Sequence, residues 1–127
     1  MQHLIDTLSK GWRAERSLSQ MTLGKLISIL SGLPKETKIE KLCSPHSYRG
    51  YYSDLSFKKE SGEQSVGELL SILQNECIDK TFEGYKGGDF TMDEHTPLWI
   101  ADYGCTGLKI MELKEGEVLS FTTKDDE

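Results

Sequence analysis

The chain has 127 residues, which is enough for one domain with its own core and no need of disulfides or bound metals. Its formal net charge of −6 argues against wrapping duplex nucleic acid, because proteins of that class present a basic face to the phosphates. No apolar run approaches the roughly 20 residues of a membrane span, and the N-terminus lacks the apolar segment of a secretion signal. We therefore expect a cytoplasmic protein whose three cysteines are reduced thiols.

The first twenty residues place apolar side chains at helical spacing and continue into the charged residues Arg13, Glu15 and Arg16. The apolar positions are Leu4, Ile5, Leu8 and Trp12. This spacing predicts a short amphipathic helix, and we treat residues 1–20 as an N-terminal helical extension. The pattern leaves two roles open: the helix packs on a partner, or it covers the protein's own core.

Two later segments, TLGKLISIL (22–30) and SVGELLSIL (65–73), resemble each other. Each begins with a hydroxyl residue that can cap a helix, and each then has apolar residues at i, i+3, i+4 and i+7, so both are predicted to be amphipathic helices. In the second segment, the sequence from Ser65 to Glu68 fits a capping box. The glycine in each first turn, Gly24 or Gly67, either exposes amides to an anion or lets the helix start pack closely on the sheet. We favour close packing.

Elsewhere the apolar residues alternate, which is typical of half-buried strands. The segments are 37–42, 52–57, 81–85, 89–92, 98–103, 107–113 and 118–122. Short strands joined by tight turns favour antiparallel pairing. The predicted fold class is therefore α+β, with two amphipathic helices packed on a meandering, mostly antiparallel sheet. It forms a single ligand-binding domain over residues 21–123, followed by a charged tail at 124–127.

One candidate binding segment is CSPHSYRGYY (43–52), because it places one of the three arginines of the chain among several aromatic residues. The guanidinium of Arg49 can fork onto a phosphate or stack on a base, and a neighbouring tyrosine, Tyr48 or Tyr51, can stack or donate its hydroxyl. The alternative is an arginine that only pairs with one of the 21 acidic residues. The sequence leaves both interpretations open.

A second candidate is FEGYKGGDFTM (82–92), which combines aromatic residues with three glycines. As a structural element, Gly87 and Gly88 suit a two-residue hairpin turn, and the phenylalanines suit a cross-strand or core pair. As a binding element, the glycine amides can approach a phosphate beside the charge of Lys86. Considered alone, the segment favours the hairpin.

The sequence predicts neither a metal site nor a reaction centre. Cys43 and His46 have a C-x2-H spacing, but the second close pair of a structural zinc site is missing. There is no GxSxG or HExxH motif and no paired H-x-[ST] signature, and nothing near Cys105 would activate its thiol. We therefore expect a protein that needs no cofactor and is not an enzyme.

The segments TLGKLISIL, SYRGYYSDLSF, SVGELLSIL, TFEGYKGGDFTMDEHTPLWIADYG and CTGLKI together resemble the Thoeris anti-defence family of small phage and prophage proteins. The resemblance covers roughly residues 21–113. It implies an α+β fold that assembles as dimers and, in some members, as hexamers. It also implies that a glyco-cyclic ADP-ribose signal binds intact in a pocket between protomers, which deprives a host defence effector of its activator. Some members also hold cyclic trinucleotides at a separate site.

With this resemblance, we expect the loop and the hairpin to supply the ligand contacts. Arg49 and Lys86 would neutralise the pyrophosphate, and aromatic rings would stack on the adenine. The expected ligand-binding residues are Tyr48, Arg49, Tyr51, Phe82, Lys86, Gly87, Gly88, Phe90, Thr91 and Lys109. Lys109 stands where many relatives have arginine, which reduces a bidentate contact to a point charge.

Two other functions fit parts of the sequence. A phage inhibitor that contacts a host defence or nucleic-acid-binding protein would use the acidic charge and the acidic tail, but it leaves the glycine–aromatic segments unexplained. A hydrolase of cyclic signals would need the reaction centre that the sequence does not offer.

Overall fold

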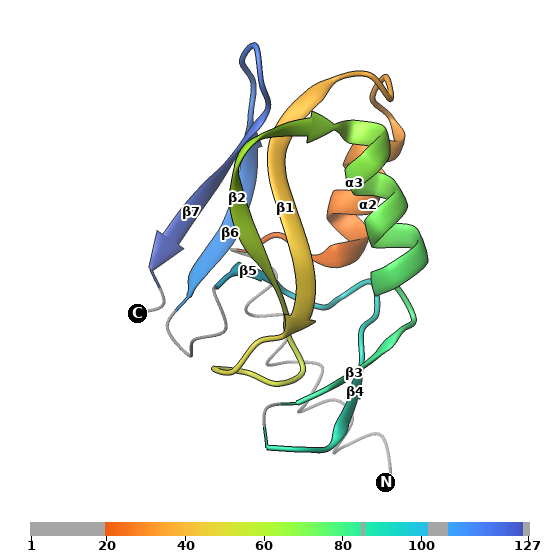
Figure 1. Cartoon of the computed structure of the whole chain (residues 1–127), viewed down its shortest axis with the longest axis vertical. Coiled ribbons are helices and arrows are strands. Elements are labelled where there is room, and N and C mark those ends of the chain that lie inside the picture. Colours follow the sequence, from red (N-terminus) through yellow and green to blue (C-terminus); the bar gives the residue numbers. More distant parts are fainter. Residues whose placement is uncertain (1–19, 85, 102–106, 126–127) are drawn as a thin grey trace, which may run out of the picture.

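The structure of the protein is a computed structural model that describes residues 20–84, 86–101 and 107–125. Three parts of the sequence analysis lie outside these residues: the helix predicted near the N-terminus, the end of the predicted strand 98–103, and Cys105. The described residues form an α+β fold in which two helices lie against a curved, mostly antiparallel sheet, as predicted (Figure 1). None of the helices among them is both long and apolar enough to cross a membrane.

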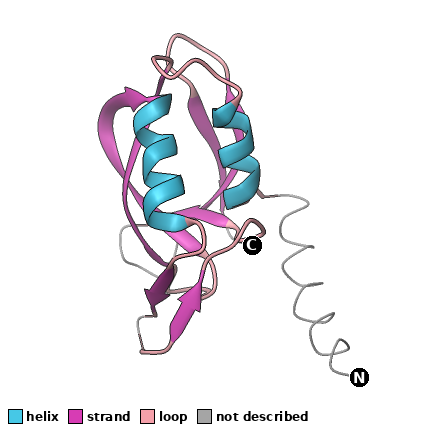
Figure 2. Cartoon of the chain, turned by 90° about the vertical axis from the view of Figure 1, so that its right-hand side faces the viewer, coloured by secondary structure: helices cyan, strands magenta, loops and turns pink. Residues whose placement is uncertain are grey.

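Both helices begin at the caps that the sequence predicts. Helix α2 (Leu23–Ser31) follows Thr22, whose hydroxyl accepts a hydrogen bond from the Lys25 amide at 3.3 Å. Helix α3 (Val66–Ile72) follows Ser65 and has a complete capping box, after which the chain continues as a π-helical turn, η1 (Leu73–Cys77). The two helices lie side by side and bury their apolar faces against the sheet (Figure 2).

The main sheet has five strands in the order β1-β2-β5-β6-β7. Their bounds are β1 (Lys38–Ser47), β2 (Leu55–Ser65), β5 (Leu98–Ile100), β6 (Leu108–Lys114) and β7 (Ser120–Asp125). All neighbours are antiparallel except β2 and β5, which are parallel. A separate hairpin of β3 (Thr81–Glu83) and β4 (Asp89–Thr91) extends from one end (Figure 1). Strand β7 includes Lys124 and Asp125, so the predicted charged tail begins inside a strand.

The sheet curves so that its first and last strands meet. Ile39 forms an isolated bridge with Leu119, supported by a 2.9 Å hydrogen bond from the Glu40 amide to the Leu119 carbonyl. The Glu40 carboxylate accepts a hydrogen bond from the Phe121 amide at 2.8 Å and lies 2.7 Å from the Lys59 ammonium. This half-buried carboxylate therefore joins β1, β2 and β7.

We expect the fold to lose stability on acidification through Glu40. Burial raises the pKa of its carboxyl, but the hydrogen bonds from Lys59 and Phe121 and the charge of Lys59 outweigh that effect, so the pKa is lowered overall. A carboxyl of lowered pKa stabilises the fold above its unfolded pKa of about 4.3, and this stabilisation is lost as the pH falls through the folded pKa. In urea unfolding from about pH 7 to pH 3, the free energy of unfolding should decline less for Glu40→Gln than for the wild type.

A suitable control for this prediction is Glu63→Gln, because Glu63 makes a longer and more exposed contact with Lys38, at 3.8 Å. The free energy of unfolding of this variant should fall on acidification as much as that of the wild type. Equal declines for Glu40→Gln and the wild type would show that Glu40 does not join the strands as described.

Candidate functional site

The loop 48–54 between β1 and β2 and the β3–β4 hairpin occupy the same end of the molecule, the lower end in Figure 1. They touch through two aromatic rings: the centroids of Tyr52 and Phe90 are 5.9 Å apart, with the planes tilted by 54°. The two segments that the sequence marks as candidate binding elements are therefore neighbours in space, although about forty residues separate them along the chain.

Tyr48 forms the buried side of the loop. Its ring is fully buried and stacks on Trp99, with centroids 4.3 Å apart, and its hydroxyl accepts a hydrogen bond from the Gly107 amide at 2.8 Å. Two glycines border the ring: a Cβ at Gly50 would lie 2.7 Å from it, and a Cβ at Gly107 would lie 2.9 Å from it. The expectation that Tyr48 stacks on a ligand is corrected, because its ring is enclosed by the protein.

Trp99 and Asp54 fix this loop, and sequence reasoning assigned neither of them a role. The Trp99 indole N–H donates to the Asp54 carboxylate at 2.8 Å, and both side chains are fully buried. The Asp54 backbone closes the loop, since its carbonyl accepts from the Tyr48 amide at 2.9 Å and its amide donates to Tyr51 at 2.8 Å. The signal in the sequence was the tryptophan itself, because a buried indole N–H needs an acceptor.

Replacing Asp54 with alanine should destabilise the protein by about 1–3 kcal/mol, because the buried indole N–H of Trp99 then loses its acceptor. Asp54→Asn keeps an oxygen at this position and should cost less. Urea unfolding of the two variants compares them directly. A loss as large for asparagine as for alanine would show that the charge of Asp54, and not its hydrogen bond, stabilises the loop.

The outer side of the loop carries Arg49 and Tyr51, both exposed. Tyr51 is 40% exposed and leans against Trp99, with ring centroids 5.7 Å apart. The accessible aromatic ring next to Arg49 is therefore that of Tyr51, with the buried pair of Tyr48 and Trp99 as its support.

The hairpin confirms the structural role of its glycines. Gly87 and Gly88 have φ values of +90° and +84°, which favour glycine, and the Gly87 amide donates to the Gly84 carbonyl at 2.9 Å. That amide is therefore used within the turn, which corrects the expectation that it contacts a phosphate. Phe82 and Phe90 are cross-strand partners, half-buried against the core.

The remaining expected residues are divided between the hairpin and the sheet. Lys86 is exposed at the hairpin turn, and the Thr91 hydroxyl lies 2.9 Å from the Thr81 hydroxyl on the exposed face. Lys109 lies on β6 directly opposite Trp99, so the two side chains share a face of the sheet. The structure thus places Arg49, Tyr51 and Lys86 on the surface at one end of the molecule. It places Lys109 beside Trp99, the buried residue on which the loop 48–54 packs.

A serine–histidine pair was also missed by sequence reasoning. The Ser56 hydroxyl lies 2.7 Å from His46 Nε2, and His46 Nδ1 lies 2.7 Å from the Ser44 carbonyl. A carbonyl only accepts, so Nδ1 donates to Ser44, and in that tautomer Nε2 accepts the hydrogen bond from the serine. This arrangement matches a nucleophile and its base, but Ser56 is fully buried, which withholds its hydroxyl from a substrate.

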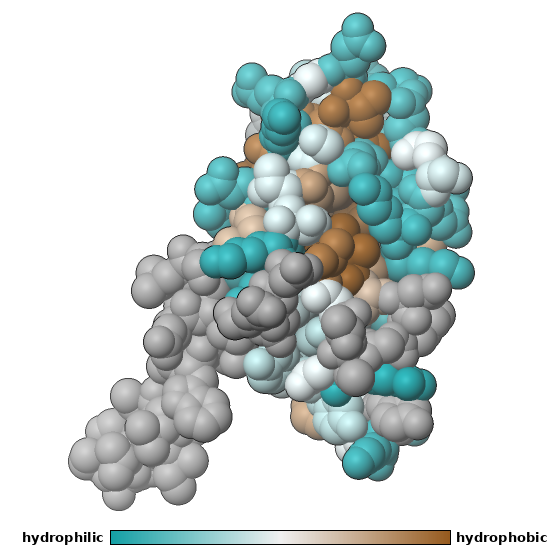
Figure 3. Space-filling view, turned by 90° about the vertical axis from the view of Figure 1, so that its left-hand side faces the viewer, coloured by the Kyte–Doolittle hydropathy of each residue, from teal (hydrophilic) through white to brown (hydrophobic). Residues whose placement is uncertain are grey.

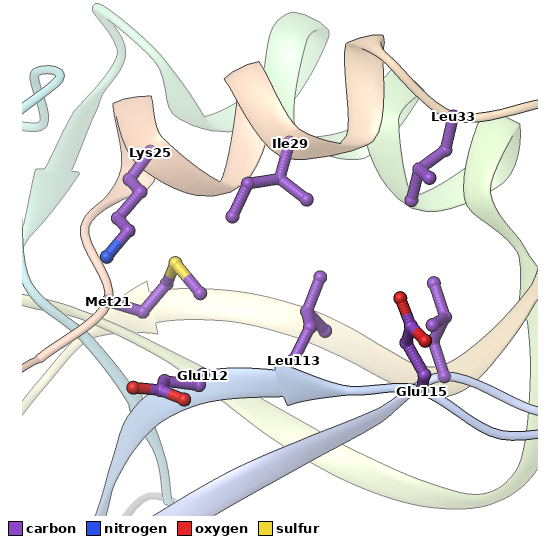
Figure 4. A pocket seen from close by; sticks show the side chains of 8 residues that line it. Met21, Lys25, Ile29, Leu33, Glu112, Leu113 and Glu115 are labelled. Atoms are coloured by element: carbon purple, nitrogen blue, oxygen red, sulfur yellow. The ribbon is translucent and has the colours of Figure 1, made fainter.

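Other features of the described residues lie apart from this end. They contain no group of three or more His, Cys, Asp or Glu side chains placed to hold a metal ion. A hollow of about 340 Å³ lies between α2 and β6, and none of the expected ligand-binding residues lines it (Figure 4).

The Gly24 and Gly67 amides donate to the Glu94 and Lys35 carbonyls, each at 2.9 Å, so close packing explains these glycines, as expected.

Comparison of the chain with models of protein families, with curated proteins and with solved structures finds no match.

Proposed function

We propose that the protein binds and sequesters a small cyclic nucleotide signal of the glyco-cyclic ADP-ribose class, without cleaving it, in the cytoplasm of a bacterial host. The observation that carries this proposal is the contact between Tyr52 and Phe90. It brings the arginine loop and the glycine hairpin to the same end of the molecule, which is where one ligand could contact both (Figure 1). The resemblance to the Thoeris anti-defence family supplies the class of ligand.

The exposed groups at this end supply the chemistry that such a ligand needs. The ring of Tyr51 offers a face for adenine, while Arg49 and Lys86 offer cations for the pyrophosphate. The cations must act locally, because a protein of net charge −6 repels an anion at long range. Thr81 and Thr91 add hydroxyls that can bind a ribose.

The shape of this end favours a site that two protomers share. The groups that contact the ligand in this proposal lie on exposed surface, and a tightly bound small molecule usually has most of its surface covered by protein. A second copy packed on the same end would supply the missing wall. A homodimer, or a larger assembly of dimers, is therefore part of the proposal.

The pair formed by Ser56 and His46 bears on whether the signal is cleaved. Since the Ser56 hydroxyl is buried, the described residues offer it no route to a bound nucleotide. This favours binding without hydrolysis, in which the amount of signal removed is proportional to the amount of protein.

Isothermal titration with cyclic ADP-ribose isomers and cyclic tri-adenylate, followed by chromatography of the recovered ligand, tests the proposal. We expect tight binding of at least one ADP-ribose isomer and its recovery unchanged. Recovery of an altered ligand would instead identify a hydrolase. Binding of none of the compounds would overturn the proposal and direct attention to the alternative, an inhibitor that contacts a host protein.

A further inference from the structure

A groove with apolar walls runs between α2 and β6. Ile29 and Leu113 face each other across it (Figure 4), and both are only half-buried. Lys25, Met21 and Glu112 lie at one end, and Leu33 and Glu115 lie at the other (Figure 4). On the side of the molecule that carries β6 and β7, hydrophobic residues gather in patches bordered by hydrophilic residues (Figure 3). The groove has a volume of about 340 Å³.

We propose that residues 4–12 of the same chain dock in this groove as a helix. The segment has one apolar face at helical spacing and no other assigned role. The apolar side chains of that face are Leu4, Ile5, Leu8 and Trp12. Burying them against Ile29 and Leu113 removes apolar surface of both partners from water.

The length of the chain and the position where the described part begins both fit this occupant. Met21 lines one end of the groove, so the preceding segment joins the domain at the groove itself. A helix over residues 4–12 is about 13 Å long, which matches α2 with its nine residues. Residues 13–20 span up to about 27 Å, enough for the helix to turn back antiparallel to α2. Such a tether raises the local concentration of the segment and favours docking within one chain.

Charge also favours this occupant. The cations Lys10, Arg13 and Arg16 outnumber the carboxylates Asp6 and Glu15, so residues 1–19 carry a net positive charge while the whole chain carries −6. The charged side chains that line the groove are two carboxylates, Glu112 and Glu115, and one cation, Lys25. In the antiparallel arrangement, the basic residues after Trp12 lie at the end that carries Glu112 and Lys25 (Figure 4).

Gln20 gives an independent sign at the point where the segment joins the domain. Its side-chain amide donates to the Leu98 carbonyl at 2.8 Å, but its Oε1 atom is buried without a hydrogen-bond partner among the described residues. Buried polar atoms of this kind normally have a partner. A donor from the docked segment would satisfy it.

The full chain labelled with 5-fluorotryptophan tests this proposal by fluorine NMR, because its only two tryptophans are Trp12 and Trp99. Trp99 is fully buried and reports on the fold, while Trp12 reports on docking. Trp12→Phe assigns the lines. We expect the Trp12 line of the wild type to be insensitive to exchange of H2O for D2O. Ile29→Glu should shift it to the position seen in urea and make it sensitive to solvent, with the Trp99 line unchanged.

The matched control is Ser28→Glu, which adds the same charge to the adjacent, exposed position of α2 and should leave both lines in place. If Ile29→Glu also moves the Trp99 line, Leu33→Glu at the other end of the groove provides the second variant. A Trp12 line that is exposed in the wild type, or unmoved by both groove variants, would overturn the proposal. A line that becomes exposed on dilution would show docking on a second copy and would overturn docking within one chain.

Discussion

Replacing Arg49 with alanine is expected to weaken binding of a glyco-cyclic ADP-ribose by about 10- to 150-fold and to leave the melting temperature unchanged. Hydrogen bonds to charged groups contribute about 1.5–3 kcal/mol each, which corresponds to this range. Arg49 lies on the exposed side of a loop whose rigidity comes from the stacking of Tyr48 on Trp99 and the hydrogen bond from Trp99 to Asp54, and neither of these contacts uses the Arg49 side chain. The fold and the proposed function are thereby tested separately.

Titration calorimetry and thermal unfolding of the same samples measure both effects. Arg49→Lys keeps the charge but not the planar fork, so it should restore part of the affinity. Lys114→Ala removes an exposed cation at the far end of β6 and should bind as the wild type does. Full affinity of Arg49→Ala would remove Arg49 from the site. A lowered melting temperature would instead show that Arg49 stabilises the loop.

The helices could be predicted from the sequence because their signals are local. Thr22 and Ser65 cap helices at the positions where hydroxyl residues precede a helical apolar pattern. The hairpin and the positive φ of Gly87 and Gly88 were predictable for the same reason. The predicted two-residue turn was wrong, because the five residues 84–88 connect β3 to β4. In both cases, residues within a few positions of each other determine the conformation.

The limits and partners of the long strands depend on distant residues, and the sequence did not reveal them. Strand β2 begins at Leu55 because a turn holds Tyr51 to Asp54, and it then continues through a polar, exposed stretch to Ser65. Pairing with β1 keeps that stretch extended without any alternation of apolar residues. The parallel pairing of β2 with β5 joins segments about forty residues apart, which no local pattern records.

The same distinction applies to the candidate site. The sequence identified the loop and the hairpin, and the structure brings them together through Tyr52 and Phe90. It could not indicate which tyrosine of the loop faces inward, because that depends on Trp99 and Gly107, which follow much later in the chain. Tyr48 and Tyr51 have the same side chain, and only the contacts made in the folded chain show that Tyr48 is buried and supports the loop while Tyr51 is exposed.

Gly24→Ala is expected to destabilise the protein by about 1–3 kcal/mol, the cost typical of an overpacked position. A Cβ at this position would lie 2.6 Å from the Glu94 Cβ and 2.8 Å from the Glu94 carbonyl oxygen. The helix start cannot move away easily, because the Gly24 amide donates to that carbonyl at 2.9 Å.

Helix propensity makes the opposite prediction, since alanine is favoured over glycine by up to about 1 kcal/mol in a helix. The sign of the change in the free energy of unfolding, measured with urea, therefore shows whether close packing or helix propensity dominates at Gly24. Gly32→Ala is the control at the other end of α2. A Cβ at this position would have the Ile29 carbonyl oxygen, at 3.6 Å, as its nearest contact, so we expect the free energy of unfolding to change by no more than about 0.5 kcal/mol. If Gly24→Ala stabilises the protein, the start of α2 is not held against Glu94, and its amides become candidates for anion binding again.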